Sequence, residues 1–402
     1  MNARQMAAMA EATRLTRQGR LVEATALIQQ TLAGPAATRQ PPDTPPSGEQ
    51  AAGTPGQLPG SRPALRAIGR TQPGQIRPGW VPRRALRSPS GLRRPHRLAP
   101  PGVKPLPGRF DACSYTNAAG TRAYRLYVPA SGVGEAMPLI VMLHGGTQDA
   151  TAFAAATSMN NLAEREKFLV AYPEQASSAN AGRYWNWFAP GHQRRDAGEP
   201  SLIAGITGQV ADRYEVDASR VYVAGFSAGG AMAAVMAAVY PDLYAAVGVH
   251  SGLAYAVAGD VASAVEAMRH GPPSAARPPA LAPQARPLPL IVFHGDRDPV
   301  VAPANAAGLI GHVLAAASPD QHPGTLPATV TRGQVPGGRA YTRTCYQDPA
   351  GAALAECWII HHGGHAWSGG VPHGSYADAH GPDASAEFIR FFGEHPGIPS
   401  AR

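Results

Sequence analysis

The sequence predicts an α/β fold, a three-layer sandwich in which helices cover both faces of a mostly parallel sheet. From Phe110 onward, short apolar strands alternate with helical stretches. Several of these strands are apolar on both faces, as strands buried between two helical layers must be. The chain has 402 residues, of which 44% are hydrophobic and 15% charged, so it can bury a large core.

The predicted elements follow one another in a regular order. Six apolar runs are predicted strands: "YRLYVP" (124–129), "PLIVMLH" (138–144), "FLVAYP" (168–173), "VYVAG" (221–225), "AAVGVHSG" (245–252) and "PLIVFHG" (289–295). Helical patterns fit between them at 151–166, 201–214, 229–240 and 303–316. A helical insertion with a Pro/Ala-rich tail occupies 256–284, and "DASAEFIRFFGEH" forms the final helix. The predicted domain spans 109–395.

The N-terminal part of the chain has a different character. Residues 1–34 carry two short apolar stripes separated by Gly19, which indicates a helical hairpin too small to be stable alone. Residues 35–108 are rich in Pro, Gly, Ser and Arg and poor in aromatic residues. Such a segment cannot bury enough apolar surface to offset its ordering entropy, so we expect a disordered linker.

The positive charge is concentrated in this linker. The formal charge of the chain is +8, whereas residues 35–108 alone carry about +10, which leaves the predicted domain near neutral. This distribution does not favour specific nucleic-acid binding by the domain, but residues 1–108 could contact a polymer granule or an anionic surface. We expect neither a transmembrane segment nor a secretory signal, because no apolar run has the required length.

The three cysteines are too few for a disulfide framework. Cys345 and Cys357 flank a predicted hairpin turn centred near Gly351 and are expected to face each other across two strands. A disulfide and a reduced apolar pair are both compatible with this pattern. Cys113 has no evident partner.

The segment "GFSAG" (225–229) lies between a predicted strand and a predicted helix. This pattern is typical of a tight turn that raises a nucleophilic serine, Ser227, at the carboxyl end of the sheet. A helix beginning directly after it would place its positive end near the developing negative charge. A turn built of small residues for packing alone is the alternative interpretation.

A serine nucleophile needs a base, and the base needs an acid to orient it. "FHGDRDPVV" ends a strand with two acids; we predict that Asp298 is the catalytic acid and that Asp296 caps the turn. His365 in "HHGGHAW" is the predicted base, while one of His361 and His362 is expected to point into the flank of the sheet as a structural histidine. These three histidines have no carboxylate or cysteine at ligand spacing, so no metal and no cofactor is expected.

Two backbone N–H groups are expected to bind the oxyanion. Ala228 directly follows the serine, and Gly146 in "LHGGTQ" is the predicted second donor, with Thr147 as the alternative. His144 in the same segment is expected to be a packing residue. Three tryptophans, Trp185, Trp187 and Trp367, are predicted to wall the substrate cleft, with core packing as the alternative.

Together these motifs resemble the polyhydroxybutyrate (PHB) depolymerase-type esterase family of the α/β-hydrolase superfamily. The resemblance covers about residues 110–393 and is carried by "VMLHGGTQDA", "FLVAYPEQ", "YWNWF", "RRDAGEPSLIAGIT", "VYVAGFSAGGAMAA", "YPDLYAAVGVHSGL", "FHGDRDPVV" and "GGHAWSGG". It implies a serine esterase with the triad Ser227, Asp298 and His365, acting on poly- or oligo(3-hydroxyalkanoate) or short acyl esters. Feruloyl or acetylxylan esterase activity is one alternative, and a granule- or surface-binding protein is another.

One departure from the family pattern involves a cysteine pair. Similar proteins often have cysteines after "HG" and before "WNW" that form a bridge; here the positions hold Gly146 and Tyr184. A joint loss of both cysteines suits a reducing compartment. The family resemblance implies an extracellular protein, whereas the missing pair and the missing secretory signal favour the cytoplasm. The sequence leaves the compartment open.

Overall fold

The computed structural model describes residues 106–131, 134–273, 287–317, 326–348 and 351–397, besides Glu11 and Leu27. The predicted helical hairpin and the predicted linker lie almost entirely outside these residues, as does the Pro/Ala-rich end of the insertion. Within the described residues, no helix is long and apolar enough to span a membrane.

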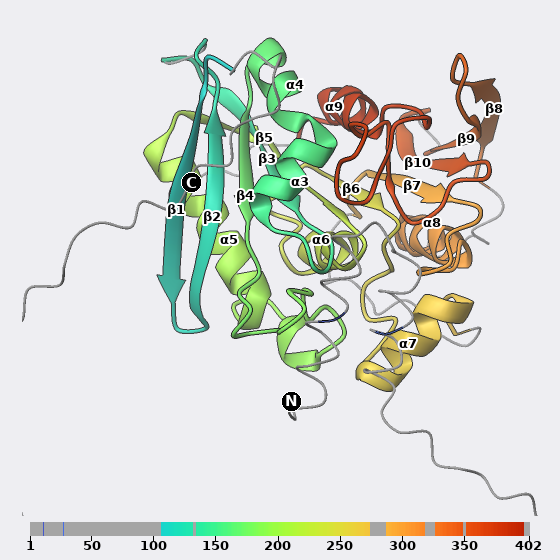
Figure 1. Ribbon diagram of the computed structural model, residues 1–402, viewed down its shortest axis with the longest axis horizontal. Coiled ribbons are helices and arrows are strands. Elements are labelled where there is room, and N and C mark those ends of the chain that lie inside the picture. The colour runs from blue at the N-terminus through green and yellow to red at the C-terminus, as the bar shows by residue number, and fades with distance from the viewer. Residues whose placement is uncertain are drawn as a thin grey trace, which may run out of the picture. The chain divides into compact units, whose positions relative to one another are not determined.

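A ten-stranded sheet forms the centre of the described domain (Figure 1). Its strand order is β1-β2-β4-β3-β5-β6-β7-β10-β9-β8, and the six strands from β4 to β10 are parallel. Antiparallel strands extend both edges. The strands are β1 (Arg109–Asn117), β2 (Gly120–Val128), β3 (Met137–Leu143), β4 (Leu169–Pro173), β5 (Val216–Phe226), β6 (Ala246–His250), β7 (Leu290–Gly295), β8 (Ala328–Gln334), β9 (Ala340–Gln347) and β10 (Ala353–Ile360).

Helices cover both faces of this sheet (Figure 1). On one face lie α3 (Ala150–Thr157), α4 (Met159–Glu166) and α9 (Ala384–Glu394); on the other lie α5 (Gly198–Arg213), α6 (Ala228–Val239) and α8 (Ala304–Ala317). Each face has its own apolar core, with Phe153 and Phe388 in one and Ile206 and Met236 in the other. The predicted three-layer α/β sandwich is confirmed.

The remaining elements are short or stand apart from the sheet. The insertion contains α7 (Val261–His270), whose first turn is closed by reciprocal hydrogen bonds between Asp260 and Ser263. A 3₁₀ helix, η1 (Pro190–His192), precedes α5, and β11 (Trp367–Ser368) pairs with β12 (Ala377–Asp378). All six predicted strands are present. The predicted helix at 151–166 is two helices, because Ser158 adopts a left-handed backbone conformation with φ 52°.

The expectation that Cys345 and Cys357 face each other is wrong. They do lie on the two strands of a hairpin, β9 and β10, but Cys345 pairs with Glu356 and Cys357 with Thr344. Because successive side chains of a strand point to opposite faces, this offset of one residue places the two thiols on opposite sides of the sheet. Both cysteines are free, as is Cys113.

Candidate active site

The turn between β5 and α6 holds Ser227 in a strained conformation, with φ 54° and ψ −120°. Close packing, rather than backbone angle, explains the flanking glycines. A Cβ atom on Gly225 would lie 2.3 Å from the carbonyl oxygen of Gly229, and one on Gly229 would lie 2.1 Å from that of Leu143. Only glycine lets the helix approach the strands this closely, and this approach raises the serine.

Asp298 and His365 reach the same place from two neighbouring loops. Asp298 follows β7, His365 follows β10, and these two strands are adjacent and parallel, so their carboxyl ends meet at one edge. Nε2 of His365 lies 2.9 Å from Oγ of Ser227, and its Nδ1 lies 2.7 Å from Oδ2 of Asp298. The three predicted side chains therefore form one continuous chain of hydrogen bonds.

The Asp298 carboxylate is buried and held from both sides. Its Oδ1 accepts hydrogen bonds from the backbone N–H groups of Val300 and Val301, at 2.8 and 2.9 Å. Burial alone would raise the pKa of Asp298, but the neighbouring His365, His294 and the Val301 N–H lower it to about 2. An ionised carboxylate accepts from Nδ1–H of His365, which leaves Nε2 free to accept the serine proton.

Asp296, the competing acid, makes different contacts. Its Oδ1 accepts from the backbone N–H of His362 at 2.6 Å, and its Oδ2 lies 3.0 Å from Nδ1 of His361. These bonds tie the turn after β7 to the end of β10, away from Ser227. In the part of the chain that the structure describes, no group of three His, Cys, Asp or Glu side chains is arranged to hold a metal ion.

Both residues predicted as oxyanion donors line the cavity that contains Ser227. Ala228 is the first residue of α6, and Gly146 lines the same cavity as Ser227. Thr147, the alternative to Gly146, uses its backbone N–H in a 2.8 Å hydrogen bond to the carbonyl of Gly182. Because that group is occupied, Gly146 is the better placed candidate.

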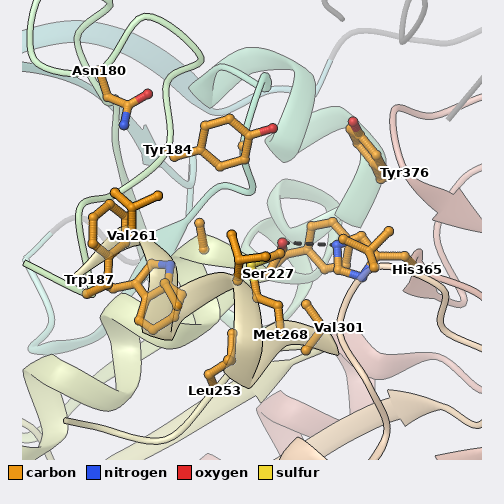
Figure 2. A pocket seen from close by; sticks show the side chains of 17 residues that line it. Asn180, Tyr184, Trp187, Ser227, Leu253, Val261, Met268, Val301, His365 and Tyr376 are labelled. Carbon is orange, nitrogen blue, oxygen red and sulfur yellow. Dashed lines mark hydrogen bonds between the residues drawn. The ribbon is translucent and has the colours of Figure 1, made fainter. Parts of the chain in front are cut away.

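A mainly apolar cavity opens beside Ser227 (Figure 2). Aliphatic and aromatic side chains form most of its wall, and Asn180, Tyr184 and Tyr376 bring polar atoms to it. These three residues and the wall formed by α7 were not among the predicted cavity residues. The signal for α7 was present, since an apolar stripe at i, i+3, i+4 and i+7 marks one helix face: Val261, Ala264, Val265 and Met268.

Of the three tryptophans, Trp187 alone lines this cavity. The prediction for Trp185 and Trp367 is wrong, because both indoles are buried elsewhere. Trp185 donates from Nε1 to the carbonyl of His144 at 3.1 Å. Trp367 donates to Ser385 at 3.0 Å and packs edge-on against Phe153 in the core on the α3 and α9 face. Although Trp367 is close to His365 in sequence, its side chain does not line the cavity.

His144 is a packing residue, as predicted. It is fully buried, its Nε2 accepts from the N–H of Gln175 at 3.0 Å, and its Nδ1 lies 2.7 Å from the carbonyl of Gly145. Burial lowers the pKa of His144 to about 4, so the ring is neutral. The neutral ring joins the segment after β3 to the segment after β4.

This fold, with a strained serine between β5 and α6 and the histidine and aspartate after later strands, defines the class as an α/β-hydrolase. The sequence model of the esterase PHB depolymerase family matches residues 122–336, more than half of the chain. The chain therefore belongs to the esterase PHB depolymerase family.

Similar proteins include several esterases. The chain is 38% identical over 199 residues to poly(3-hydroxyalkanoate) depolymerase C of Paucimonas lemoignei, covering 47% of each. It is 35% identical over 150 residues to feruloyl esterase B of Neurospora crassa, covering 37% of this chain and 50% of that one. The chain thus spans about half the length of the curated relatives it matches.

Among solved structures, the acetyl xylan esterase from Aspergillus awamori superimposes with a TM-score of 0.54. The match covers 71% of this chain and all of that chain, at 19% sequence identity. At this identity the similarity concerns the fold, and it agrees with the α/β-hydrolase architecture.

Proposed function

We propose that this protein is a serine esterase that hydrolyses carboxylic esters through an acyl-enzyme. The observation that carries the proposal is the unbroken hydrogen-bond chain from Ser227 through His365 to Asp298, with distances of 2.9 and 2.7 Å. Membership of the esterase PHB depolymerase family supports the same reaction class.

The mechanism follows from the proton positions. As Oγ of Ser227 attacks the ester carbonyl carbon, its proton passes to Nε2 of His365, and Asp298 stabilises the imidazolium. The N–H groups of Ala228 and Gly146 bind the oxyanion. His365 then protonates the departing alkoxide and leaves the acyl group on the serine. Finally, His365 takes a proton from the water that attacks the acyl-enzyme and returns it to Oγ of Ser227 as the acid leaves.

The cavity wall supports an aliphatic acyl or hydroxyacyl group as the substrate. Trp187, Leu253, Val261, Met268 and Val301 form an apolar surface beside Ser227 (Figure 2). A hydrocarbon chain gains free energy by leaving water for such a surface. We therefore propose poly- or oligo(3-hydroxyalkanoate) or short acyl esters as substrates.

The first test replaces the nucleophile. Ser227→Ala should lower kcat for p-nitrophenyl butyrate by about 10⁴-fold or more, because no other group can form the acyl-enzyme. The matched control is Ser251→Ala, which removes a second buried hydroxyl that contacts His250. Retained hydrolysis by folded Ser227→Ala would remove this serine from the mechanism.

Comparing 3-hydroxybutyrate oligomers with methyl ferulate distinguishes the proposed substrate from the feruloyl esterase alternative.

We also propose that residues 1–108, through the basic segment 35–108, tether the esterase to a polymer granule or anionic surface. Its net charge of about +10 supports this, since the rest of the chain is near neutral. Replacing Arg83, Arg84, Arg93 and Arg94 with Gln in the full chain should reduce co-sedimentation with polyhydroxybutyrate granules. Turnover of a soluble ester should stay unchanged. Equal co-sedimentation of both proteins would discard the tether.

A further inference from the structure

We propose that Glu199, far from the triad in sequence, is a positioning residue that fixes the oxyanion-binding loop 144–148. This inference rests on the proposed esterase function. Glu199 lies in the first turn of α5 and its side chain is completely buried. It does not touch the cavity, so any effect on catalysis must pass through the residues it binds.

The Glu199 carboxylate accepts three hydrogen bonds from two residues. Its Oε2 accepts from the backbone N–H of Asn186 at 2.7 Å, and its Oε1 accepts from Nδ2 of Asn186 at 2.6 Å. Nε2 of Gln175 donates to the same Oε1 at 2.5 Å. The Arg122 guanidinium, itself buried, lies 3.7 Å away. This carboxylate therefore joins Gln175, which follows β4, to the segment that carries Tyr184 and Trp187 of the cavity wall.

Gln175 and Asn186 connect Glu199 to the cavity wall. Nε2 of Gln175 also donates to the carbonyl of Tyr184 at 2.9 Å. Asn186 stands between Trp185 and Trp187 in the chain, so its two bonds to Glu199 fix the backbone of segment 182–187. Tyr184 and Trp187 of this segment line the cavity.

Segment 182–187 in turn holds the oxyanion loop at three points. The carbonyl of Gly182 accepts from the N–H of Thr147 at 2.8 Å. Nε1 of Trp185 donates to the carbonyl of His144 at 3.1 Å. The ring of Tyr184 lies against Gly146 so closely that a Cβ atom there would be 2.0 Å from the ring. Segment 182–187, which Glu199 binds, therefore fixes the position of Gly146.

Glu199→Gln should disturb this arrangement without leaving a large cavity. A glutamine amide turns one N–H₂ toward the donors on Asn186 or Gln175, so at least one buried donor loses its acceptor. A displacement of the oxyanion donors by a fraction of an ångström to 1 Å weakens bonds made mainly in the transition state. The expected result is a fall in kcat of about 10- to 100-fold with KM changed by less than about threefold.

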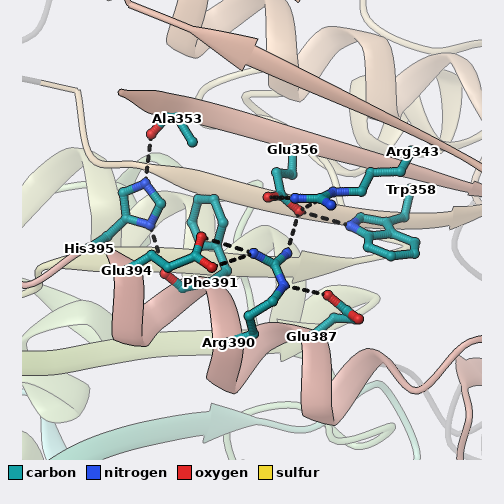
Figure 3. A network of polar contacts seen from close by, with 9 residues as sticks. All are labelled: Arg343, Ala353, Glu356, Trp358, Glu387, Arg390, Phe391, Glu394 and His395. Atoms are coloured by element: carbon teal, nitrogen blue, oxygen red, sulfur yellow. Dashed lines mark hydrogen bonds and ion pairs between the residues drawn. The ribbon is translucent and has the colours of Figure 1, made fainter. Parts of the chain in front are cut away.

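The matched control is Glu356→Gln. Glu356 is also completely buried and also binds arginine, but it lies on β10, where it contacts Arg390 of α9, and it does not line the cavity (Figure 3). Both variants lose one buried charge. We therefore expect Glu356→Gln to lower stability while kcat of the folded protein stays within about twofold of wild type.

The experiment measures kcat and KM for p-nitrophenyl butyrate and the Ki of butaneboronic acid, whose tetrahedral serine adduct places an oxygen between the oxyanion donors. In Glu199→Gln, the Ki should rise by the same factor by which kcat/KM falls. A change confined to KM, an unchanged Ki, or an equal loss in Glu356→Gln would overturn the positioning role. Wild-type protein that neither hydrolyses the ester nor binds the boronic acid would instead refute the esterase function.

A second variant covers the case in which Glu199→Gln does not fold. Asn186→Ala keeps the carboxylate and the backbone bond, but it removes two side-chain bonds: the one from Nδ2 to Glu199 and the one that Oδ1 accepts from Asn180. It should give a smaller loss of kcat, on the order of threefold to tenfold, with a matching rise in Ki. An unchanged kcat and Ki in this variant would also overturn the proposal.

Discussion

Two buried carboxylates on neighbouring parts of the sheet, Asp298 and Glu356, differ in the partners that neutralise them. Asp298 follows β7 and binds backbone N–H groups and His365. Glu356 lies within β10 and binds Arg343, Arg390 and Nε1 of Trp358 (Figure 3). Both side chains have no exposed surface. The two carboxylates are therefore equally buried, but different kinds of partner compensate their charges.

The difference lies in whether the partner can change its charge. Arginine keeps its proton at any ordinary pH, so Glu356 sits in a permanently compensated ion pair. Arg390 also binds Glu387 and Glu394 within α9, so its ion pair with Glu356 joins α9 to β10. In the proposed mechanism His365 gains a proton, and the ionised Asp298 favours that step. One carboxylate stabilises the fold, and the other is placed to support proton transfer.

Within this comparison of two carboxylates, the largest expected effect comes from removing the Asp298 charge without changing its shape. In Asp298→Asn, the amide oxygen can still accept from Val300 and Val301, while the N–H₂ group faces Nδ1 of His365. This favours the tautomer whose Nε2 carries the proton, which cannot accept the proton of Ser227. The expected loss in kcat is about 10³- to 10⁴-fold.

Steady-state kinetics on p-nitrophenyl butyrate and a thermal unfolding curve check this prediction. Glu356→Gln serves as the comparison, because it removes a buried charge whose partners are arginines. It should shift the unfolding curve and leave kcat near wild type. If the two variants lost activity equally, the distinction between a structural and a catalytic carboxylate would fail.

The sequence was sufficient to place the central sheet and the contacts among Ser227, His365 and Asp298. Strands apolar on both faces have a clear pattern, and catalytic side chains in loops after parallel strands converge at one edge of the sheet. The same reasoning separated Asp298 from Asp296. Each inference depended on residue types in a local pattern, which the sequence records directly.

The cavity wall could not be predicted in the same way. Whether an indole faces a cleft or a core depends on which helix packs over it, as Trp367 in the core and Trp187 in the cavity demonstrate. The offset of Cys345 from Cys357 depends on strand register, because the residue across from Cys345 is Glu356. The positioning role proposed for Glu199 depends on its contacts with residues 13 and 24 positions away in sequence, which no single motif encodes.

A smaller effect of the Asp298 carboxylate should appear in the unfolding free energy of the protein at acidic pH. The folded pKa of Asp298, about 2, lies below its ordinary value of 3.8, so the ionised form stabilises the fold. This stabilisation, about 2 kcal/mol, is fully present above pH 4 to 5 and is lost as the pH falls toward 2. Asp298→Asn lacks this contribution, so the gap in unfolding free energy between wild type and variant should narrow over that range.

Denaturant unfolding of both proteins at several pH values between 6 and about 2 measures the gap. The direction of the change tests the direction of the pKa shift. If the folded pKa of Asp298 were raised instead of lowered, the difference in unfolding free energy between the two proteins would widen as the pH falls. Glu356 adds a contribution of the same sign, because burial would raise its pKa but Arg343 and Arg390 lower it. That contribution is common to wild type and Asp298→Asn and cancels in their difference. A gap that stayed constant with pH would mean that Asp298 gains no stabilisation from its partners.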